Sequence, residues 1–553
     1  MMRLLRGYPS TTMDDYQLNT INILKHSKRN FQEREITCRN NDGKILRTNY
    51  EDTFIRVSKM ANALEELGIK PGDRVGVLDW NTYNYYCLFF AISGIGATLV
   101  ELNLRLHPNE ISYVANHSKV KWIFVDESLL SLAEIIMNNV KVKNFVVISE
   151  SNKFETKLEN TVSFYELIEK QKETYDFPMI DERTACVATY SSGTTGSPKG
   201  VYFSHRAIVL HALSQAVALN LKSEDAALFL VPMFHIHSWN MPYSSTLAGA
   251  KLVFPGKYSI NEPEPIINLI LNEGVTLFNA APTVLNSLIN YLENSNKQII
   301  LNSKVTCGGS EPPLALMKRA KKFGIEVIHA YGCTETDAAT WFEITYPELR
   351  GKLSEEEIWN LKKMQGLPIF GIEYKIIDEN GNELPKDSKS VGEIIMRGHF
   401  VANSYYNSPA TVESFIEYEL DRWWKSGDAA YATYRNFIKI VDRFKDLIKS
   451  GGEWISSVDM ENHLMSHPAV LEAAVVGIQH EKWGERPLAF VVLKKEYKDK
   501  VSKEEIYRHL SSKFAKWQLP DEILFIDEVP KTSVGKFNKR VLRERYKDFY
   551  LKK

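Results

Sequence analysis

Helical and strand patterns alternate along residues 50–366, and this alternation leaves few folds open. Residues 54–67 and 85–92 repeat apolar side chains at helical spacing, whereas residues 74–78 and 97–102 are strand-like. Further short apolar segments with strand character are residues 122–125, 144–148, 250–254, 276–279 and 326–329. Strands separated by amphipathic helices are typical of βαβ units. The sequence therefore predicts an α/β fold.

The pattern changes after about residue 366, where shorter strands begin and the Asn380-Gly381 pair predicts a hairpin turn. The predicted short strands are residues 373–377, 392–397 and 437–441. Beyond residue 442, helix and strand patterns follow at residues 458–465, 473–478, 488–493, 503–513 and 522–526. Because 553 residues exceed what one core supports, we predict two domains. The first is large, with βαβ sheets and a small β subdomain, and the second is a small α+β unit.

Composition excludes some partners. The 68 Lys and Arg residues balance 69 Asp and Glu, so no positive field that would gather nucleic acid is expected.

Five cysteines without a CxxC pair disfavour disulfides and zinc, which predicts a reducing, cytoplasmic location. The longest uncharged run, residues 85–100, is too short and too polar for a transmembrane segment, and residues 1–10 show no signal peptide. The basic residues 536–553 are predicted to form a solvated terminal helix.

The most informative segment runs from Tyr190 to Gly200 and reads YSSGTTGSPKG. Glycines let backbone N–H groups converge on an anion, hydroxyls add further donors, and Lys199 supplies positive charge. The segment is no Walker loop, because Pro198 stands where that motif has glycine. A flexible linker is the alternative, which the strand-like residues on both sides disfavour. We therefore predict a phosphate-binding loop.

This loop resembles the signature of the acyl-adenylate-forming superfamily, which includes acyl-CoA synthetases, adenylation domains of peptide synthetases and luciferases. Five further motifs of that superfamily have similar segments here in the same order. They are PMFH at 232–235, YGCTE at 331–335, WKSGD at 424–428, DRFKD at 442–446 and PKTSVGK at 530–536. Over nearly its whole length the chain resembles thermophilic long-chain fatty-acyl-CoA synthetases. The resemblance implies an enzyme that uses ATP, Mg²⁺ and coenzyme A.

The resemblance also assigns residues to the nucleotide and to coenzyme A. The residues expected to bind these groups are Ser191, Ser192, Gly193, Thr194, Thr195, Gly196, Lys199, Gly309, Ser310, Ala330, Tyr331, Gly332, Thr334, Asp428, Arg443, Lys449, Gly451, Gly452 and Trp454. The expected catalytic residues are Lys536, His235, Thr195 and Glu335. Glu335 is a hard oxygen ligand suited to Mg²⁺, and Ser191 is a second candidate. Asp428 can accept both ribose hydroxyls, although a helix N-cap is an alternative.

Three residues bear on the acid. His235 is expected at the substrate, and the Phe234-His235 pair offers no carboxylate for an amino-acid ammonium, so an uncharged acyl chain is favoured. Trp239 resembles the gate of the fatty-acid tunnel in long-chain synthetases, and core packing of the indole is the alternative. Acetate-activating relatives have tryptophan where this chain has Gly332, so glycine predicts room for an acid longer than acetate.

The resemblance implies an N-terminal domain of residues 1–442 and a mobile C-terminal domain of residues 443–553 that pivots at Lys445. Lys536 would serve acyl-AMP formation, and rotation would then bring Gly451 and Gly452 to the pantetheine tunnel. Residues 1–24 resemble a dimerising segment, so we expect a homodimer. The alternatives are a CoA ligase for a short, hydroxylated or aryl acid, a luciferase-like oxygenase, and a non-catalytic acyl- or nucleotide-binding protein.

Overall fold

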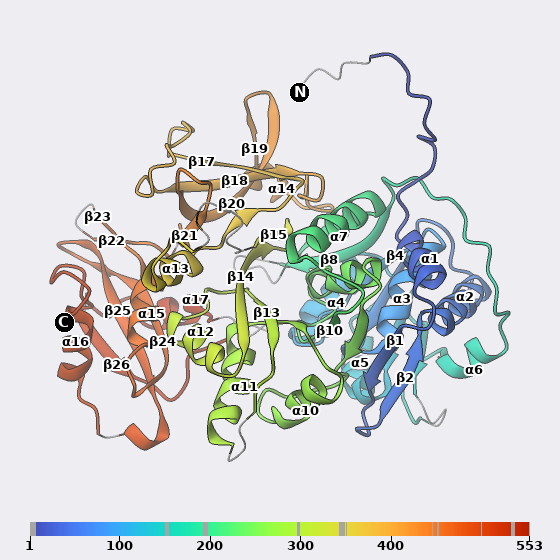
Figure 1. Cartoon of the computed structure of the whole chain (residues 1–553), viewed down its shortest axis with the longest axis horizontal. Helices are drawn as coiled ribbons and strands as arrows, with labels where there is room; N and C mark the ends of the chain where they lie inside the picture. The colour runs from blue at the N-terminus through green and yellow to red at the C-terminus, as the bar shows by residue number, and fades with distance from the viewer. Residues whose placement is uncertain are drawn as a thin grey trace.

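The computed structural model is an α/β protein with a large N-terminal domain, a β subdomain and a small C-terminal domain (Figure 1). It describes residues 7–149, 154–191, 197–295, 299–341, 349, 351–444, 446–450, 453–498, 500–531 and 537–551. None of the helices in these ranges is both long and apolar enough to cross a membrane.

A seven-stranded sheet forms one half of the large domain, and all its neighbouring strands are parallel except the last pair, β8 and β9. In spatial order its strands are β7 (Thr161–Ser163), β6 (Phe145–Ile148), β5 (Trp122–Asp126), β3 (Arg74–Leu78), β4 (Thr98–Glu101), β8 (Ala185–Ser191) and β9 (Lys199–Ser204). The parallel strands are buried apolar segments, as expected when helices cover both faces.

A nine-stranded sheet forms the other half. In spatial order its strands are β16 (Leu367–Pro368), β15 (Asp337–Trp341), β14 (Ile325–Cys333), β13 (Ser303–Cys307), β12 (Leu277–Ala280), β10 (Ala226–Phe229), β11 (Lys251–Phe254), β1 (Glu35–Arg39) and β2 (Ile45–Asn49). The central strands are parallel, whereas β14, β15 and β16 pair antiparallel. The β14–β15 hairpin carries the predicted nucleotide motif.

Helices pack between and outside the two sheets. The central core joins both sheets through α1 (Ile21–Asn30), α2 (Tyr50–Glu66), α3 (Tyr83–Gly94), α7 (His205–Leu219) and α9 (Met241–Leu247). On the outer faces lie α4 (Pro108–His117) and α5 (Leu130–Met137) for the first sheet, and α10 (Glu264–Asn272), α11 (Pro282–Asn294) and α12 (Leu314–Lys322) for the second. The short helices are α6 (Phe164–Glu169), α13 (Glu355–Lys362) and α14 (Thr411–Ser414). The segment labelled α8 (Ile236–Trp239) has left-handed backbone angles and is a turn rather than an α-helix. Phe89 of α3 stacks on Tyr243 of α9 at 5.5 Å.

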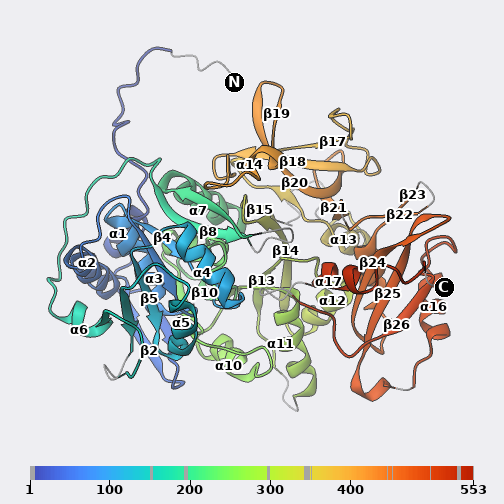
Figure 2. The ribbon, with the colours of Figure 1, turned by 180° about the vertical axis from the view of Figure 1, so that it is seen from behind.

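The β subdomain is a five-stranded antiparallel sheet. Its strands are β17 (Ile372–Ile377), β18 (Gly392–Gly398), β20 (Asp421–Ala432), β19 (Phe415–Tyr418) and β21 (Ile438–Arg443). The predicted Asn380-Gly381 turn is present, since Ile377 and Glu383 form an antiparallel bridge across it. The sheet lies above the boundary between the other two parts of the molecule (Figures 1 and 2).

The C-terminal domain has its own five-stranded sheet and its own apolar clusters. Its elements are β22 (Ile448–Ser450), β23 (Glu453–Ile455), α15 (Ser457–Leu464), β24 (Val470–His480), β25 (Gly484–Leu493), α16 (Lys503–Ser511), β26 (Glu522–Phe525) and α17 (Lys539–Arg545). Helices α15 and α16 cover one face of the sheet, and α17 packs on the other. The expected α/β class and the two-part architecture are therefore confirmed.

Candidate active site

A cleft of about 1930 Å³ lies where the large domain, the β subdomain and the C-terminal domain meet. It brings together predicted site residues that come from distant parts of the sequence. Those that line it are Ser191, Lys199, His235, Trp239, Gly309, Ser310, Ala330, Tyr331, Gly332, Thr334, Glu335, Asp428 and Arg443. Their shared location makes one composite site, while the role of each residue stays a prediction.

The remaining predicted site residues cannot be placed in this cleft. Ser192, Gly193, Thr194, Thr195, Gly196, Lys445, Gly451, Gly452 and Lys536 lie outside the described residues. Lys449 and Trp454 are described by their backbone only, as neighbouring partners in β22 and β23. Among the described parts of these two strands, no residue lines the cleft.

The predicted phosphate-binding segment is framed by paired strands. Ser191 ends β8 and Lys199 begins β9, and the two residues are antiparallel partners. The backbone N–H of Lys199 donates to Oγ of Ser191 at 3.4 Å. The segment therefore joins two adjacent strands of one sheet, and its described ends, Ser191 and Lys199, line the cleft. Its role as a phosphate-binding loop stays a prediction.

Tyr405 connects two of the predicted residues and was not predicted from the sequence. The Nζ atom of Lys199 lies 5.0 Å from the centre of its ring, a cation–π contact. The Tyr405 hydroxyl donates to Oε1 of Glu335 at 2.5 Å. Burial, followed by the charge of Glu335, raises the pKa of Tyr405 far above its usual value, so the hydroxyl remains a donor. No local sequence signal marks Tyr405, because its partner is 70 residues away.

Asp428 and Arg443 are direct partners on β20 and β21. Nε of Arg443 lies 3.0 Å from Oδ1 of Asp428, and the Tyr331 hydroxyl donates to Oδ2 at 2.7 Å. The charge of Asp428 raises the pKa of the Arg443 guanidinium, and burial together with Asp428 raises that of Tyr331. Asp428 lies within a strand, so the N-cap interpretation is wrong. A carboxylate held by two donors at the cleft wall suits recognition of a diol.

Gly332 lies at a register shift between β14 and β15. A Cβ atom at this position would lie 1.8 Å from the backbone oxygen of Asp337, which no rearrangement of a side chain could relieve. Glycine is therefore required by the hairpin itself, in addition to any role in acid size. The turn that follows is fixed by the N–H of Cys333, which donates to Oγ1 of Thr336 at 3.0 Å, and it carries Thr334 and Glu335.

Residues 236–240 form a left-handed turn. The φ angles of Ile236, His237, Ser238, Trp239 and Asn240 are 50°, 38°, 57°, 57° and 59°. A left-handed backbone costs L-residues roughly 1–2 kcal/mol each, with Asn the least affected. Five such residues in succession, none of them glycine, require strong anchoring by the surrounding structure.

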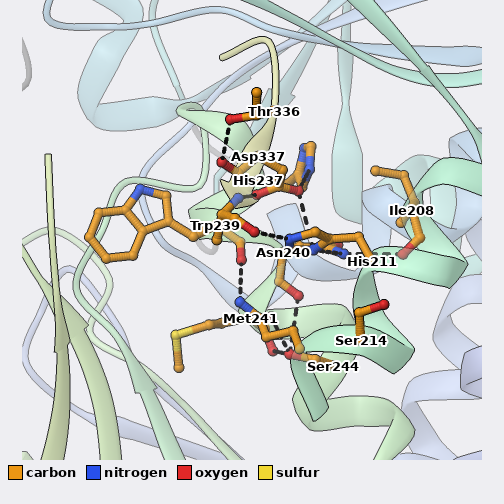
Figure 3. A network of polar contacts seen from close by, with 12 residues as sticks. Ile208, His211, Ser214, His237, Trp239, Asn240, Met241, Ser244, Thr336 and Asp337 are labelled. Atoms are coloured by element: carbon orange, nitrogen blue, oxygen red, sulfur yellow. Dashed lines mark hydrogen bonds and ion pairs between the residues drawn. The ribbon is translucent and has the colours of Figure 1, made fainter. Parts of the chain in front are cut away.

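The anchors come from several elements. Asn279 on β12 donates through Nδ2 to the backbone oxygen of Ser238 at 3.0 Å and to its Oγ at 2.9 Å. Gln215 on α7 donates to the backbone oxygen of Trp239 at 2.9 Å. Nδ2 of Asn240 donates to the backbone oxygen of Ile208 at 3.1 Å. Figure 3 shows that the Trp239 indole points away from this polar network, and the residue lines the cleft.

The C-terminal domain closes the other side of the cleft. Lys531 and Phe537 form an antiparallel bridge, and both line the cleft. Next to it, Lys539 on α17 makes an ion pair with Glu461 at 2.8 Å and donates to Ser457 at 2.7 Å. The expectation of a solvated terminal helix is wrong for Lys539, whose side chain is only 11% exposed beside these partners.

The donor set of the cleft fits magnesium bound together with a nucleotide. Magnesium in nucleotide sites is held by one or two carboxylates and by phosphate oxygens. Glu335 supplies such a carboxylate, only 8% exposed, and Tyr405 orients one of its oxygens. Among the described residues, no cluster of three or more His, Cys, Asp or Glu side chains could hold a metal ion.

Comparison with known proteins identifies the family. The AMP-binding enzyme family matches residues 24–406, and the AMP-binding enzyme C-terminal domain matches residues 459–536. This chain belongs to the AMP-binding enzyme family. It is 40% identical over 550 residues to a long-chain-fatty-acid–CoA ligase of Thermus thermophilus, covering 99% of this chain and 98% of that protein. It is 36% identical over 533 residues to a 3-methylmercaptopropionyl-CoA ligase of Ruegeria lacuscaerulensis, covering 95% of this chain and 97% of that protein.

A solved structure has the same fold. The AMP-binding enzyme described here superposes on an anthranilate CoA ligase in complex with anthranoyl-AMP with a TM-score of 0.83, at 24% identity, covering 96% of this chain and 98% of that chain. The family match confirms the predicted resemblance to acyl-adenylate-forming enzymes, and the superposition confirms the predicted fold.

Proposed function

We propose that this chain is an AMP-forming acyl-CoA synthetase, an acid–thiol ligase that activates a medium- to long-chain fatty acid with ATP and transfers it to coenzyme A. The observation that carries this proposal is the single cleft shared by Asp428, Glu335 and Trp239, the residues predicted for ribose, magnesium and acid. One site can then hold both reactants of the first step.

In the first step a carboxylate oxygen of the acid attacks the α-phosphorus of ATP. The new O–P bond replaces the bond to the bridging oxygen, and pyrophosphate leaves with the electron pair. Both reactants are anions, so fixed donors and cations are needed. Lys199 lies at the cleft, Thr334 is proposed to donate to the α-phosphate, and Lys536 is the second proposed cation. Magnesium, when bound beside Glu335, would neutralise phosphate charge.

In the second step the thiol of coenzyme A attacks the acyl carbon. A C–S bond forms, the bond from the acyl carbon to the phosphate oxygen breaks, AMP leaves with the electron pair, and the thiol proton goes to solvent. We propose that residues 443–553 rotate about Lys445 against residues 1–442 between the two steps. Lys531 and Phe537 line the cleft, which supports an arrangement suited to the first step. Rotation would exchange the segment between them for the Gly451-Gly452 loop, with Lys449 and Trp454 beside it.

A fatty acid is favoured for two reasons. The relative from Thermus thermophilus is named for long-chain fatty acids and matches along the whole chain. His235, Ile236 and Trp239 line the cleft, and the Asp337 carboxylate, which also lines it, is already paired with His237 at 3.1 Å. A short thioether acid is the second candidate, favoured by the relative from Ruegeria lacuscaerulensis.

A panel of acids tests the proposal. AMP and pyrophosphate release are measured with ATP and Mg²⁺, with and without coenzyme A. The panel comprises acetate, hydroxybutyrate, 3-methylmercaptopropionate, benzoate, octanoate and palmitate. We expect the highest kcat/KM for octanoate or palmitate, and acyl-CoA only when coenzyme A is present. A maximum at 3-methylmercaptopropionate would select the second candidate, and the absence of AMP with every acid would favour a binding protein.

We further propose a cytoplasmic homodimer. Residues 7–16 run as an extended arm away from the body of the large domain (Figures 1 and 2). Their large apolar side chains are exposed, at 97% for Tyr8, 83% for Met13 and 68% for Tyr16. A second copy of the chain would cover them. Light scattering should give a dimer mass, and deletion of residues 1–16 should yield a monomer.

A further inference from the structure

His237 supplies the charged side chain of the left-handed turn at residues 236–240, and it is fully buried. Its backbone N–H donates to Oε1 of Glu101 at 2.7 Å, and its Nδ1 lies 3.3 Å from the same oxygen. Its Nε2 lies 3.1 Å from Oδ2 of Asp337 (Figure 3). Glu101 ends β4 and Asp337 begins β15. His237 therefore ties the turn to both sheets of the large domain.

The neighbouring His211 is neutral, so it is not a second imidazolium beside Asp337. Its Nε2 donates to the backbone oxygen of Ala338 at 2.9 Å, and its Nδ1 accepts from Nδ2 of Asn240 at 2.8 Å. These contacts define a neutral imidazole with the proton on Nε2. Burial lowers the pKa of His211 despite the nearby Asp337.

His237 has a carboxylate beside each ring nitrogen. Burial alone would favour the neutral imidazole, but the contacts with Asp337 and Glu101 raise the pKa of His237 to about 9. Two aromatic rings also pack against its imidazole, Phe203 at 5.7 Å and Tyr243 at 6.3 Å between ring centres, both edge to face. Two hydrogen bonds to carboxylates hold the residue, one from its backbone N–H to Glu101 and one between Nε2 and Asp337, while Nδ1 makes only an ionic contact with Glu101 outside hydrogen-bonding geometry. Removal of the imidazole would leave two buried carboxylates without this partner, which is costly.

We propose that His237 is a positioning residue for acyl-chain selectivity, because its ties to Glu101 and Asp337 fix the direction in which Trp239 enters the cleft. The inference rests on the proposed function and concerns the acid-binding part of that site. Trp239 follows two residues after His237 in the same turn, and its indole points out of the buried network. Because Ser238 and Trp239 do not favour this backbone conformation intrinsically, the direction of the indole depends on the anchors.

The test compares acids of different length in a His237→Asn variant. Asparagine tolerates a left-handed backbone well, so the substitution removes the imidazole contacts without adding backbone strain. The readout is the ratio of kcat/KM for palmitate to kcat/KM for butyrate. We expect this ratio to move toward unity by roughly tenfold, the scale on which apolar pockets discriminate chain length. A merely structural role would lower both values equally.

A double variant decides whether the effect passes through Trp239. In a Trp239→Ala background, His237→Asn should change the ratio no further. His205→Asn is the matched control, because His205 is also a buried histidine but its Nδ1 contacts Oγ1 of Thr20, the residue before α1, at 3.0 Å and not the turn. Its ratio should stay at the wild-type value. If His237→Asn does not fold, Glu101→Gln removes the opposing charge and gives the same readout.

An unchanged ratio in a folded variant, or an equal change with and without Trp239, would overturn the inference. Failure of the proposed function has a different signature, since no acid would then support pyrophosphate release even in the unaltered chain.

Discussion

Substitution of Asp428 by asparagine is the sharpest test of the nucleotide site. The Asp428 carboxylate is 4% exposed and holds both the Tyr331 hydroxyl at 2.7 Å and Nε of Arg443 at 3.0 Å. Asparagine keeps the shape but removes the charge that would accept a ribose hydroxyl. A charged hydrogen bond contributes about 1.5–3 kcal/mol, which predicts a roughly 10- to 150-fold fall in kcat/KM for ATP.

Stability should also fall in the same variant. Arg443 is 42% exposed, but the Asp428 carboxylate is only 4% exposed and also accepts from the Tyr331 hydroxyl, so the pair is not an exposed one. We expect a loss of roughly 1–3 kcal/mol, the scale for buried donors that lose a charged acceptor. The assay is pyrophosphate release at varied ATP and saturating acid, together with a denaturant unfolding curve for each variant.

Asp421→Asn is the matched control. Asp421 also lies on β20 and pairs with an arginine, Arg397, but is not among the described residues that line the cleft. Its kcat/KM for ATP should stay at the wild-type value. A change of less than about twofold for Asp428→Asn, or an equal loss in both variants, would refute the assignment of Asp428 to the nucleotide.

Three further predictions follow from the described contacts. Glu335→Gln should lower acyl-AMP formation by roughly 10²-fold, and normal rates at low Mg²⁺ would exclude a role as metal ligand. Gly332→Ala should weaken the hairpin and lower the melting temperature, because its Cβ would meet the Asp337 backbone oxygen at 1.8 Å; a variant with unchanged melting would contradict this geometry. Burial lowers the pKa of His205 to about 4, below the value of about 6.5 in an unfolded chain. Between pH 7 and pH 4.5 the unfolded chain therefore gains this proton while the folded chain does not, and the free energy of unfolding should fall by about 2–3 kcal/mol. Denaturant unfolding curves should show a smaller fall in the free energy of unfolding for His205→Asn than for the unaltered chain. An identical pH dependence in the two proteins would refute the role of His205.

Local patterns predicted the regular elements well. Strand β3 has the bounds expected from its apolar run, Arg74–Leu78. Helix α2 begins at Tyr50, four residues before the predicted start, because Asn49 caps it by accepting from the N–H of Asp52. An asparagine at this position is a recognised N-cap residue, so the sequence already indicated the earlier start.

Long-range contacts account for what the sequence could not reveal. Tyr405 acquires its role from Glu335, and His237 acquires its charge from Glu101 and Asp337, far away in the chain. The left-handed turn at residues 236–240 contains no glycine, the residue that would have predicted such a backbone from the sequence. The sequence predicted a role for Gly332 in the size of the acid, whereas its close approach to the backbone of β15 becomes evident only in the folded hairpin.

The central claim is that one cleft makes an acyl-adenylate and then consumes it after the C-terminal domain has moved. Two single-turnover reactions of Lys536→Ala test it most directly, one from ATP and acid, the other from synthetic acyl-AMP and coenzyme A. The proposed mechanism predicts a loss of roughly 10²- to 10³-fold in the first reaction and a normal rate in the second. An equal loss in both would contradict the domain rotation.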